Sequence, residues 1–202
     1  MISAPANIVS ARTRLLEAAR DMIRARGFSA TSVDEICRAA GVTKGAFFHH
    51  FPSKEALGVA AAQFWTETTG ALFAAAPYHG PADPLDRVLA YIDFRSLLLD
   101  GDPAAFTCLA GTLVQETFGS SDPIRAACEA SIFGHAATLE ADIALAMAQH
   151  GVTGTSARSL ALHTQAVLQG GFILAKAAGG PAIARESAAH LRRYFELLFN
   201  RE

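Results

Sequence analysis

The segment 31–57 constrains the fold of this chain most, because it contains the signals for two short helices joined by a tight glycine turn. Ser32 can cap the first helix, and Glu35 three residues later completes a capping box. Gly41 falls where a helix C-terminus needs a residue that tolerates positive φ, and Thr43 can cap the second helix. The pattern predicts a helix-turn-helix whose short, cationic second helix suits a DNA major groove.

The second helix, predicted over 43–50, divides into a buried and an exposed side. Phe47 and Phe51 are four residues apart and form one apolar stripe for the core. Lys44 stands at the N-terminal end, where it can bind a phosphate or donate to a guanine edge. Gly45 has no side chain, so the backbone can approach a groove closely. The DNA-facing surface is therefore predicted on the side away from the two phenylalanines.

This region resembles the DNA-binding end of the TetR family of bacterial transcriptional regulators. The likeness rests on LLEAARDMIRARGFSATSVDEI, AAGVTKGAFFHHF and PSKEAL, and it extends to about residue 65. It implies an all-α, nine-helix fold with a DNA-binding domain at 1–52 and a ligand-binding and dimerisation domain at 53–202. By resemblance, the residues expected at the DNA are Ser32, Thr43, Lys44, Gly45, Phe48, His49, His50 and Lys54.

Phe48 departs from the family pattern, which usually has a tyrosine whose hydroxyl donates to a phosphate. A phenyl ring can only pack, and the missing hydrogen bond is worth about 1 kcal/mol. The neighbouring His49 and His50 are also open to a second interpretation, as a solvated pair. Adjacent histidines on a helix point apart, so we predict no metal site there.

The 202 residues, of which 51% are apolar, are enough for a sizeable core. The three cysteines show no CxxC pairing, so we predict neither a disulfide framework nor a zinc site, and a reducing cytoplasm is the expected location. Segment 1–12 lacks the pattern of a signal peptide. The sequence contains no uninterrupted apolar run of about 18 residues, so we predict no membrane span.

The net charge of −2 is unevenly distributed along the chain. Up to Trp65 there are eight Lys and Arg against five Asp and Glu, which gives +3, and the remainder carries −5. The positive end is the end that carries the helix-turn-helix, as phosphate binding requires. Alone this asymmetry is weak support, because charged residues usually form solvated faces.

Glycine and proline punctuation predicts helices almost throughout, and no segment alternates as a strand does. The predicted helices are 10–26, 33–40, 43–50, 53–76, 84–100, 104–117, 122–150, 155–179 and 181–200.

The middle helices are expected to enclose a mostly apolar ligand pocket. His135 interrupts the apolar stripe of helix 122–150, either as a hydrogen-bonded core residue or as a ligand contact. The predicted pocket residues are Phe64, Trp65, Phe94, Cys108, Thr112, Glu116, His135 and His163.

The stretch FTCLAGTLVQE is similar to a CLxGxLxxE segment in a TetR subgroup that responds to electrophiles and acrylate-like compounds. In some members the corresponding cysteine is the sensor, and here that residue is Cys108. A reactive thiol needs a nearby cation, and the sequence has none within one turn of Cys108. Sensor and structural thiol both remain open.

The last two helices correspond to the pair that forms a four-helix bundle with a second copy in TetR proteins. Gly170 and Gly171 permit close helix approach. The predicted interface comprises Gly171, Leu191, Tyr194 and Leu198. The alternative is that both helices serve only the core of one chain.

Together these features predict a ligand-responsive transcriptional repressor. The expected partners are operator DNA, a small-molecule effector and a second copy of the chain, with no cofactor and no membrane. An enzyme is disfavoured because the sequence has no phosphate loop, HExxH or GxSxG motif. An activator, or an adaptor that no longer binds DNA, is the remaining alternative.

Overall fold

A computed structural model describes residues 9–200, which form ten α-helices and one 3-10 helix, with no strand among them. The all-α class is therefore confirmed. The bounds are α1 (Ala11–Arg26), α2 (Val33–Ala40), α3 (Lys44–His50), α4 (Lys54–Ala74), η1 (Pro77–His79), α5 (Pro84–Leu97), α6 (Pro103–Phe106), α7 (Leu109–Thr117), α8 (Asp122–His150), α9 (Ala157–Ala178) and α10 (Ala182–Leu198). The segment that lacks a signal-peptide pattern lies mostly outside the described residues.

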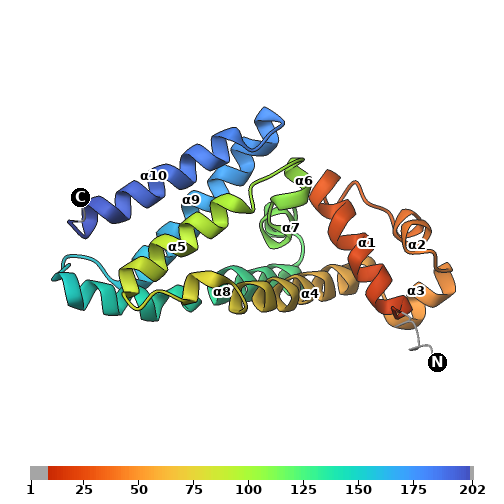
Figure 1. Ribbon diagram of the computed structural model, residues 1–202. Helices are drawn as coiled ribbons and strands as arrows, with labels where there is room; N and C mark the ends of the chain where they lie inside the picture. The colour runs from red at the N-terminus through yellow and green to blue at the C-terminus, as the bar shows by residue number, and fades with distance from the viewer. Residues whose placement is uncertain (1–8, 201–202) are drawn as a thin grey trace, which may run out of the picture.

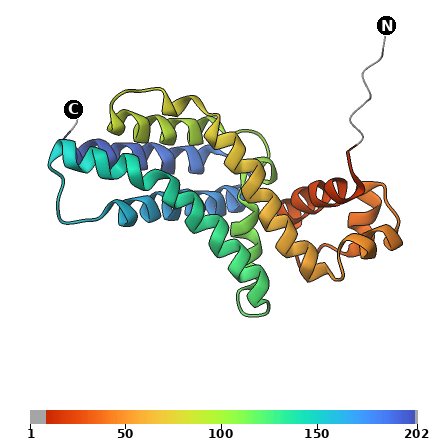
Figure 2. The same cartoon turned by 90° about the horizontal axis from the view of Figure 1, so that it is seen from below.

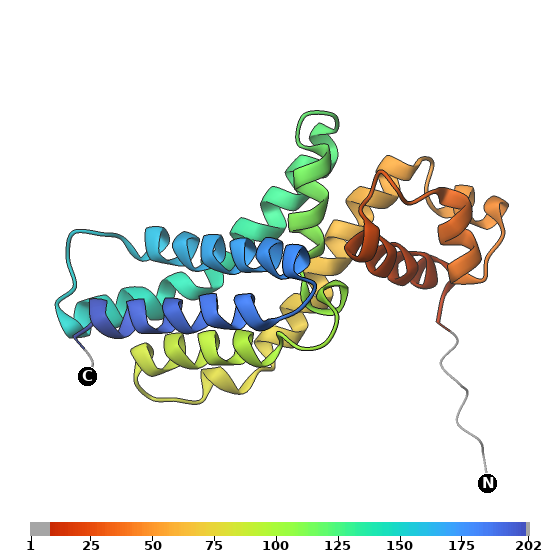
Figure 3. The same cartoon turned by 90° about the horizontal axis from the view of Figure 1, so that it is seen from above.

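Helices α1–α3 form one end of the molecule, and the remaining helices form a larger body (Figure 1). Helix α4 belongs to both, because it begins next to α3 and runs into the body, where it packs on α8 (Figure 2). Helix α10 lies between α5 and α9 and packs on both, while the α7–α8 hairpin projects away from them (Figure 3). Within residues 9–200, no helix is both long and apolar enough to cross a membrane.

The helix-turn-helix forms as its sequence predicts. The Ser32 hydroxyl accepts from the Glu35 amide, and the Glu35 carboxylate accepts from the Ser32 amide at 2.9 Å, so the capping box is complete. The Ser32 hydrogen bonds are also the main reason why the pKa of Glu35 falls to about 2. Gly41 takes the left-handed conformation with φ 62° and ends α2. Phe47 and Phe51 are buried, which confirms the predicted stripe.

The single helix predicted over 104–117 is wrong. Thr107 and Cys108 are extended, and the chain forms α6 and α7 in its place, which raises the number of α-helices to ten. The break has a tertiary cause. The guanidinium of Arg24 donates to the carbonyl oxygens of Ala105 and Thr107, which a continuous helix would need for its own hydrogen bonds.

The buried residues form two clusters, one at each end of the molecule. The first cluster joins the three DNA-end helices to the body, because Phe47 and Ile36 belong to the same apolar group as Leu109, Leu113 and Ile124. The second fills the space between α5, α8, α9 and α10. A shared core of this kind lets a shift of α7 or α8 reach the helix-turn-helix through packed side chains.

Candidate functional site

The exposed side of α3 carries the predicted DNA-facing residues. Its N-terminus is capped by the Thr43 hydroxyl, which accepts from the Ala46 amide at 3.1 Å. Phe47 turns inward, and His50 is only half-buried beside the His49 ring. The predicted contact residues that lie exposed on this helix are Lys44, Gly45, Phe48 and His49.

Two lysines near the predicted DNA surface are held by neighbours. Lys44 Nζ lies 2.8 Å from the Asp34 carboxylate, and this hydrogen bond raises the lysine pKa. Lys54 Nζ lies 4.4 Å from the centre of the Phe28 ring, and partial burial lowers its pKa. Lys54 is therefore oriented before any DNA arrives, which reduces the entropy lost when it binds phosphate. Lys44 is paired with an exposed carboxylate that a DNA phosphate must displace.

The Phe48 ring is 51% exposed, so a hydroxyl added at its para position has room to reach solvent or a DNA phosphate. We expect Phe48→Tyr to tighten operator binding by up to about 1 kcal/mol, the worth of one added hydrogen bond. Fluorescence anisotropy with a labelled operator measures the change. Unchanged or weaker binding would mean that no phosphate lies near this ring.

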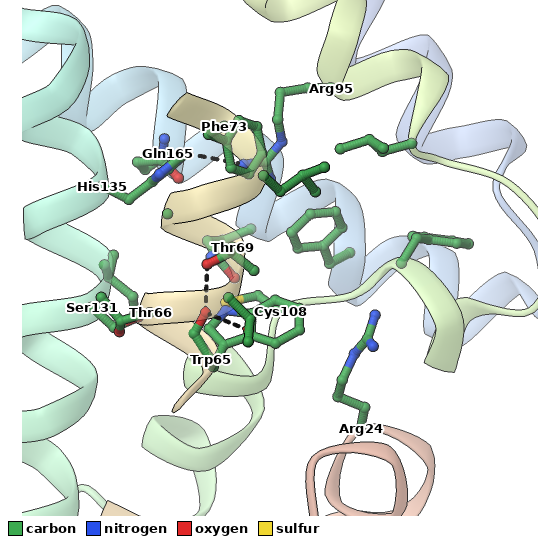
Figure 4. Close-up of a pocket in the computed structure, with 18 of the residues that line it drawn as sticks. Arg24, Trp65, Thr66, Thr69, Phe73, Arg95, Cys108, Ser131, His135 and Gln165 are labelled. Atoms are coloured by element: carbon green, nitrogen blue, oxygen red, sulfur yellow. Dashed lines mark hydrogen bonds between the residues drawn. The ribbon is translucent and has the colours of Figure 1, made fainter. Parts of the chain in front are cut away.

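A cavity of about 430 Å³ lies in the body beside α4 (Figure 4). Its wall comes from α1, α4–α6, α8 and α9, with Cys108 at the α6–α7 break. The apolar part of the wall combines aromatic and aliphatic side chains. It is formed by Trp65, Phe73, Phe106 and Phe172 together with Leu72, Leu98, Leu99 and Ile132.

Three of the predicted pocket residues, Trp65, Cys108 and His135, line this cavity. The other five do not. Thr112 accepts a hydrogen bond from Lys176, Glu116 binds the α1–α2 loop, and the His163 ring packs on Tyr194. The remaining two, Phe64 and Phe94, are half-buried against the two apolar clusters.

The charged part of the lining, which the sequence did not suggest, is basic. Arg20, Arg24 and Arg95 all line the cavity, while no Asp or Glu of the described residues does. Arg24 was counted in the positive charge of the DNA-binding end, yet only 8% of it is exposed and it points into the body. Arg95 was detectable in principle, because it follows Val88 and Ile92 at helical spacing on the buried face of α5.

A buried polar network surrounds His135, which agrees with its interpretation as a hydrogen-bonded core residue. The Tyr91 hydroxyl donates to His135 Nε2 at 2.8 Å and accepts from Gln165 at 3.2 Å. Arg95 Nη1 lies 3.3 Å from both the Tyr91 oxygen and His135 Nε2. Because arginine can only donate, Nε2 is an acceptor and His135 is neutral with its proton on Nδ1. His135 is thus both a hydrogen-bonded core residue and part of the cavity wall.

Burial, with a further contribution from Arg95, lowers the pKa of His135 from 6.5 to about 4. In the unfolded chain this histidine takes up its proton first as pH falls, so the folded state loses stability between pH 6.5 and 4. We expect His135 to account for about 2 kcal/mol of stability lost between pH 7 and 5. Urea unfolding of the wild type and of His135→Gln at both pH values measures this share. Equal pH dependence in the two proteins would contradict it.

Two contacts join the cavity region to the DNA-binding end. Arg24 of α1 binds the C-terminal carbonyls of α6 and lies 4.8 Å from the centre of the Trp65 ring. The Glu116 carboxylate of α7 accepts from the amides of Phe28 and Ser29 at 2.9 and 2.8 Å. The adjacent Gly27 has φ 94°, and a Cβ atom there would meet the Glu116 carboxylate at 2.4 Å, so this loop position requires glycine.

The outer face of α9 and α10 carries apolar side chains, but two predicted interface residues are not on it. Gly171 faces Ala184 of the same chain, and Leu191 is 2% exposed in the core. These two assignments are corrected, because both positions are already covered within one chain. Of the other two, Tyr194 is exposed and Leu198 half-buried. We define the outer face by His163, Val167, Gly170, Leu174, Ile183, Tyr194, Leu197 and Leu198.

A helix-turn-helix end, one long connecting helix and a helical body with an internal cavity define a class, the helix-turn-helix transcriptional regulators. The family model for bacterial regulatory proteins of the tetR family matches residues 15–61, and that for the LmrA/YxaF-like regulator C-terminal domain matches residues 84–190. The chain belongs to the TetR family of transcriptional regulators. Like these relatives, it is a transcriptional regulator and not an enzyme.

Individual relatives agree with this assignment. The chain is 31% identical to the transcriptional regulator AcuR of Cereibacter sphaeroides over 58% of its own length and 53% of that protein. It is 24% identical to the uncharacterised regulator YxaF of Bacillus subtilis over 81% of its length and 83% of that protein. A TetR-family regulator structure from Agrobacterium tumefaciens superposes with a TM-score of 0.79 at 23% identity, covering 91% of this chain and 96% of the other.

Proposed function

We propose that this regulator is a repressor that binds a palindromic operator as a dimer and releases it when a small molecule occupies the cavity. The observation that carries the proposal is the position of Arg24. This residue belongs to the first helix of the DNA-binding end, and its side chain forms part of the cavity wall. A ligand in the cavity therefore contacts the DNA-binding end directly.

The release mechanism follows from the same contacts. A ligand that displaces α6 or Trp65 changes the contacts of the Arg24 guanidinium. A shift of α7 moves the α1–α2 loop, because Glu116 of α7 is hydrogen-bonded to that loop. Helix α4 is the third connection, since Glu55 near its start accepts a hydrogen bond from Ser121 at 2.6 Å. Such shifts change the separation of the two recognition helices in a dimer, so both half-sites are no longer engaged together.

The proposed partners follow from the two surfaces. We assign DNA contact to Ser32, Thr43, Lys44, Gly45, Phe48, His49, His50 and Lys54, and dimer contact to the outer face of α9 and α10. One short helix reads only a few base pairs, so a two-fold protein suits two half-sites. Because the proposed target is chromosomal DNA, the cytoplasm is the proposed location.

Selection from a random duplex pool tests the operator proposal. The purified protein should enrich a palindrome of about 16–28 base pairs, with half-sites one or more helical turns apart. Binding should weaken steeply as salt rises. A pool in which no sequence is enriched would favour the adaptor function and overturn the proposal.

A covalent route into the same cavity is the second candidate, and it rests on the environment of Cys108. This half-buried thiol caps α7, where its Sγ accepts from the Gly111 amide at 3.4 Å. The sequence showed no cation within one turn, but Arg24 and Lys176 are close enough to Cys108 for an electrostatic interaction. The thiol therefore lies on the cavity wall with its neighbours Arg24 and Lys176 on the side of α1 and α9.

We expect N-ethylmaleimide to modify Cys108 at least about tenfold faster than Cys37 or Cys128, because Cys108 lines the cavity and access to the thiol controls the rate. Both other thiols are buried, and burial raises the pKa of Cys37 and raises that of Cys128 to about 12. Labelling followed by mass spectrometry gives the three rates, and Cys108→Ser is the control for operator release. Equal rates at the three thiols would remove the covalent candidate.

A further inference from the structure

The charged lining of the cavity is unbalanced. Its wall contains three arginines, and within residues 9–200 no aspartate or glutamate shares that wall. Arg20 is paired with Asp21, but Arg24 and Arg95 form no salt bridge with any carboxylate of the described chain. A buried cation without an anion is costly, so such a site favours an anion supplied from outside.

Of the two unpaired arginines, Arg24 already has partners for its hydrogen bonds. Its Nε and Nη2 atoms donate to the Thr107 and Ala105 carbonyl oxygens, and its guanidinium lies near the Trp65 ring. Within the cavity Arg24 therefore acts mainly as the link between α1 and α6. Its positive charge still contributes to the field that an anion would meet.

Arg95 is different, because much of its donor capacity is free. Only 9% of the residue is exposed. Nη1 is its one nitrogen with hydrogen-bond partners, which are the Tyr91 oxygen and His135 Nε2. A guanidinium has five N–H groups, and for Arg95 those on Nε and Nη2 have no acceptor within the described residues. Both nitrogens keep some accessible surface, and Arg95 lines the cavity, so they border its open space.

The surroundings hold the Arg95 fork in place. The guanidinium carbon lies 5.2 Å from the centre of the Phe73 ring and 5.6 Å from that of Phe172. Figure 4 shows Arg95 reaching in from α5 beside Phe73, with Gln165 and His135 beyond Phe73 in this view. A fixed fork with two free N–H-bearing nitrogens matches the two oxygens of a carboxylate.

We propose that the effector is an organic carboxylate with an apolar body, whose carboxylate binds Arg95 and whose body lies between Trp65, Phe73 and Phe172. This inference rests on the proposed function, in which the cavity is the effector site. The volume of about 430 Å³ falls within the range of small-molecule sites and suits a body of one ring or a medium-length alkyl chain.

Matched pairs of probes test the charge requirement. Octanoate is compared with octanamide, and 4-phenylbutanoate with 4-phenylbutanamide, so that each pair differs only in the carboxylate. Trp65 is the single tryptophan of the chain and lines the cavity, so its fluorescence reports occupancy, with calorimetry as a second readout. We expect each carboxylate to bind at least about ten times more tightly than its amide, because charge-assisted hydrogen bonds are stronger than neutral ones.

Substitution of Arg95 then assigns the contact. In Arg95→Gln the preference for carboxylate should fall to about twofold or less, and Arg95→Lys should lose part of it because a lysine has no fork. Arg158→Gln is the control, since Arg158 is exposed on α9 and forms no ion pair with the described residues. It should keep the full preference. Circular dichroism melting verifies that each variant is folded.

Several results would overturn the inference. They are equal affinity for amide and carboxylate in the wild type, no saturable binding of either carboxylate, or an unchanged preference in folded Arg95→Gln. Operator release, measured in parallel, separates this failure from failure of the proposed function. Release by an amide alone refutes the carboxylate but keeps the ligand-responsive repressor. Binding of a carboxylate without any release of operator refutes the repressor mechanism but keeps the ligand class.

Discussion

Replacing Leu197 by aspartate is expected to convert the proposed dimer into monomers and to weaken operator binding by about a hundredfold or more. Leu197 is 63% exposed in one chain and lies on the outer face with Tyr194 and Leu198. A charge placed there stays hydrated in the monomer but loses its water in a dimer, which is costly on a mostly apolar face. Sedimentation velocity and operator anisotropy measure the two effects.

The matched control is Leu145→Asp, which introduces the same charge at an apolar residue that is 55% exposed on α8. This variant should remain dimeric and bind the operator normally. Dimers that persist in Leu197→Asp at micromolar concentration would exclude the outer face of α9 and α10 as the interface. Monomers in both variants would point to general destabilisation.

Substitution of Lys44 by alanine should weaken operator binding by roughly tenfold to a hundredfold, because a dimer loses two base or phosphate contacts at once. Lys44 is exposed at the start of the recognition helix α3. If the lost contacts are with phosphate, the slope of log affinity against log salt should also become shallower by about two. Anisotropy titrations at several salt concentrations give both quantities.

Asp34→Asn separates DNA contact from local structure. Asp34 is the partner of Lys44 in the free protein, so the variant breaks the same ion pair while it keeps the lysine. It should bind the operator at least as tightly as the wild type, since a competing anion is gone. If Lys44→Ala and Asp34→Asn weakened binding equally, the role of Lys44 would be to hold α2 and α3 together.

The helix-turn-helix was predictable because its signals are local. The capping box of Ser32 and Glu35, the left-handed Gly41 and the Phe47–Phe51 stripe each lie within one or two turns of helix. Helix propensity and capping act over the same distance. The helix bounds, caps and buried stripe of the helix-turn-helix therefore follow from the sequence, whereas the inward direction of Arg24 does not.

The cavity was only partly predictable because its wall is assembled from segments far apart in the chain. Arg24 and Cys108 are separated by 84 positions in the sequence and meet at the α6–α7 break, where Arg24 donates to the carbonyl oxygens of Ala105 and Thr107. Helical spacing gives the direction of a side chain relative to its own helix only. Glu116 and His163 were accordingly assigned to the pocket, although neighbouring helices direct them elsewhere.

The outer face shows how sharply such a prediction depends on one residue of register. Gly170 and Gly171 are adjacent, and no sequence signal separates their roles. A Cβ atom added to Gly171 would contact Ala184 of α10, whereas one added to Gly170 meets nothing within 4 Å. Successive residues of a helix are rotated by about 100°, so Gly171 faces α10 while Gly170 lies on the outer face.

The central claim is that ligand in the cavity and operator on α3 weaken each other's binding, and one reciprocal titration tests it. Trp65 fluorescence follows 4-phenylbutanoate binding with and without saturating operator, and operator anisotropy is measured with and without ligand. Linkage requires the same factor in both directions, and a coupling of about 10- to 100-fold is expected. Equal operator affinity with the cavity empty and full, while Trp65 reports occupancy, would contradict the account.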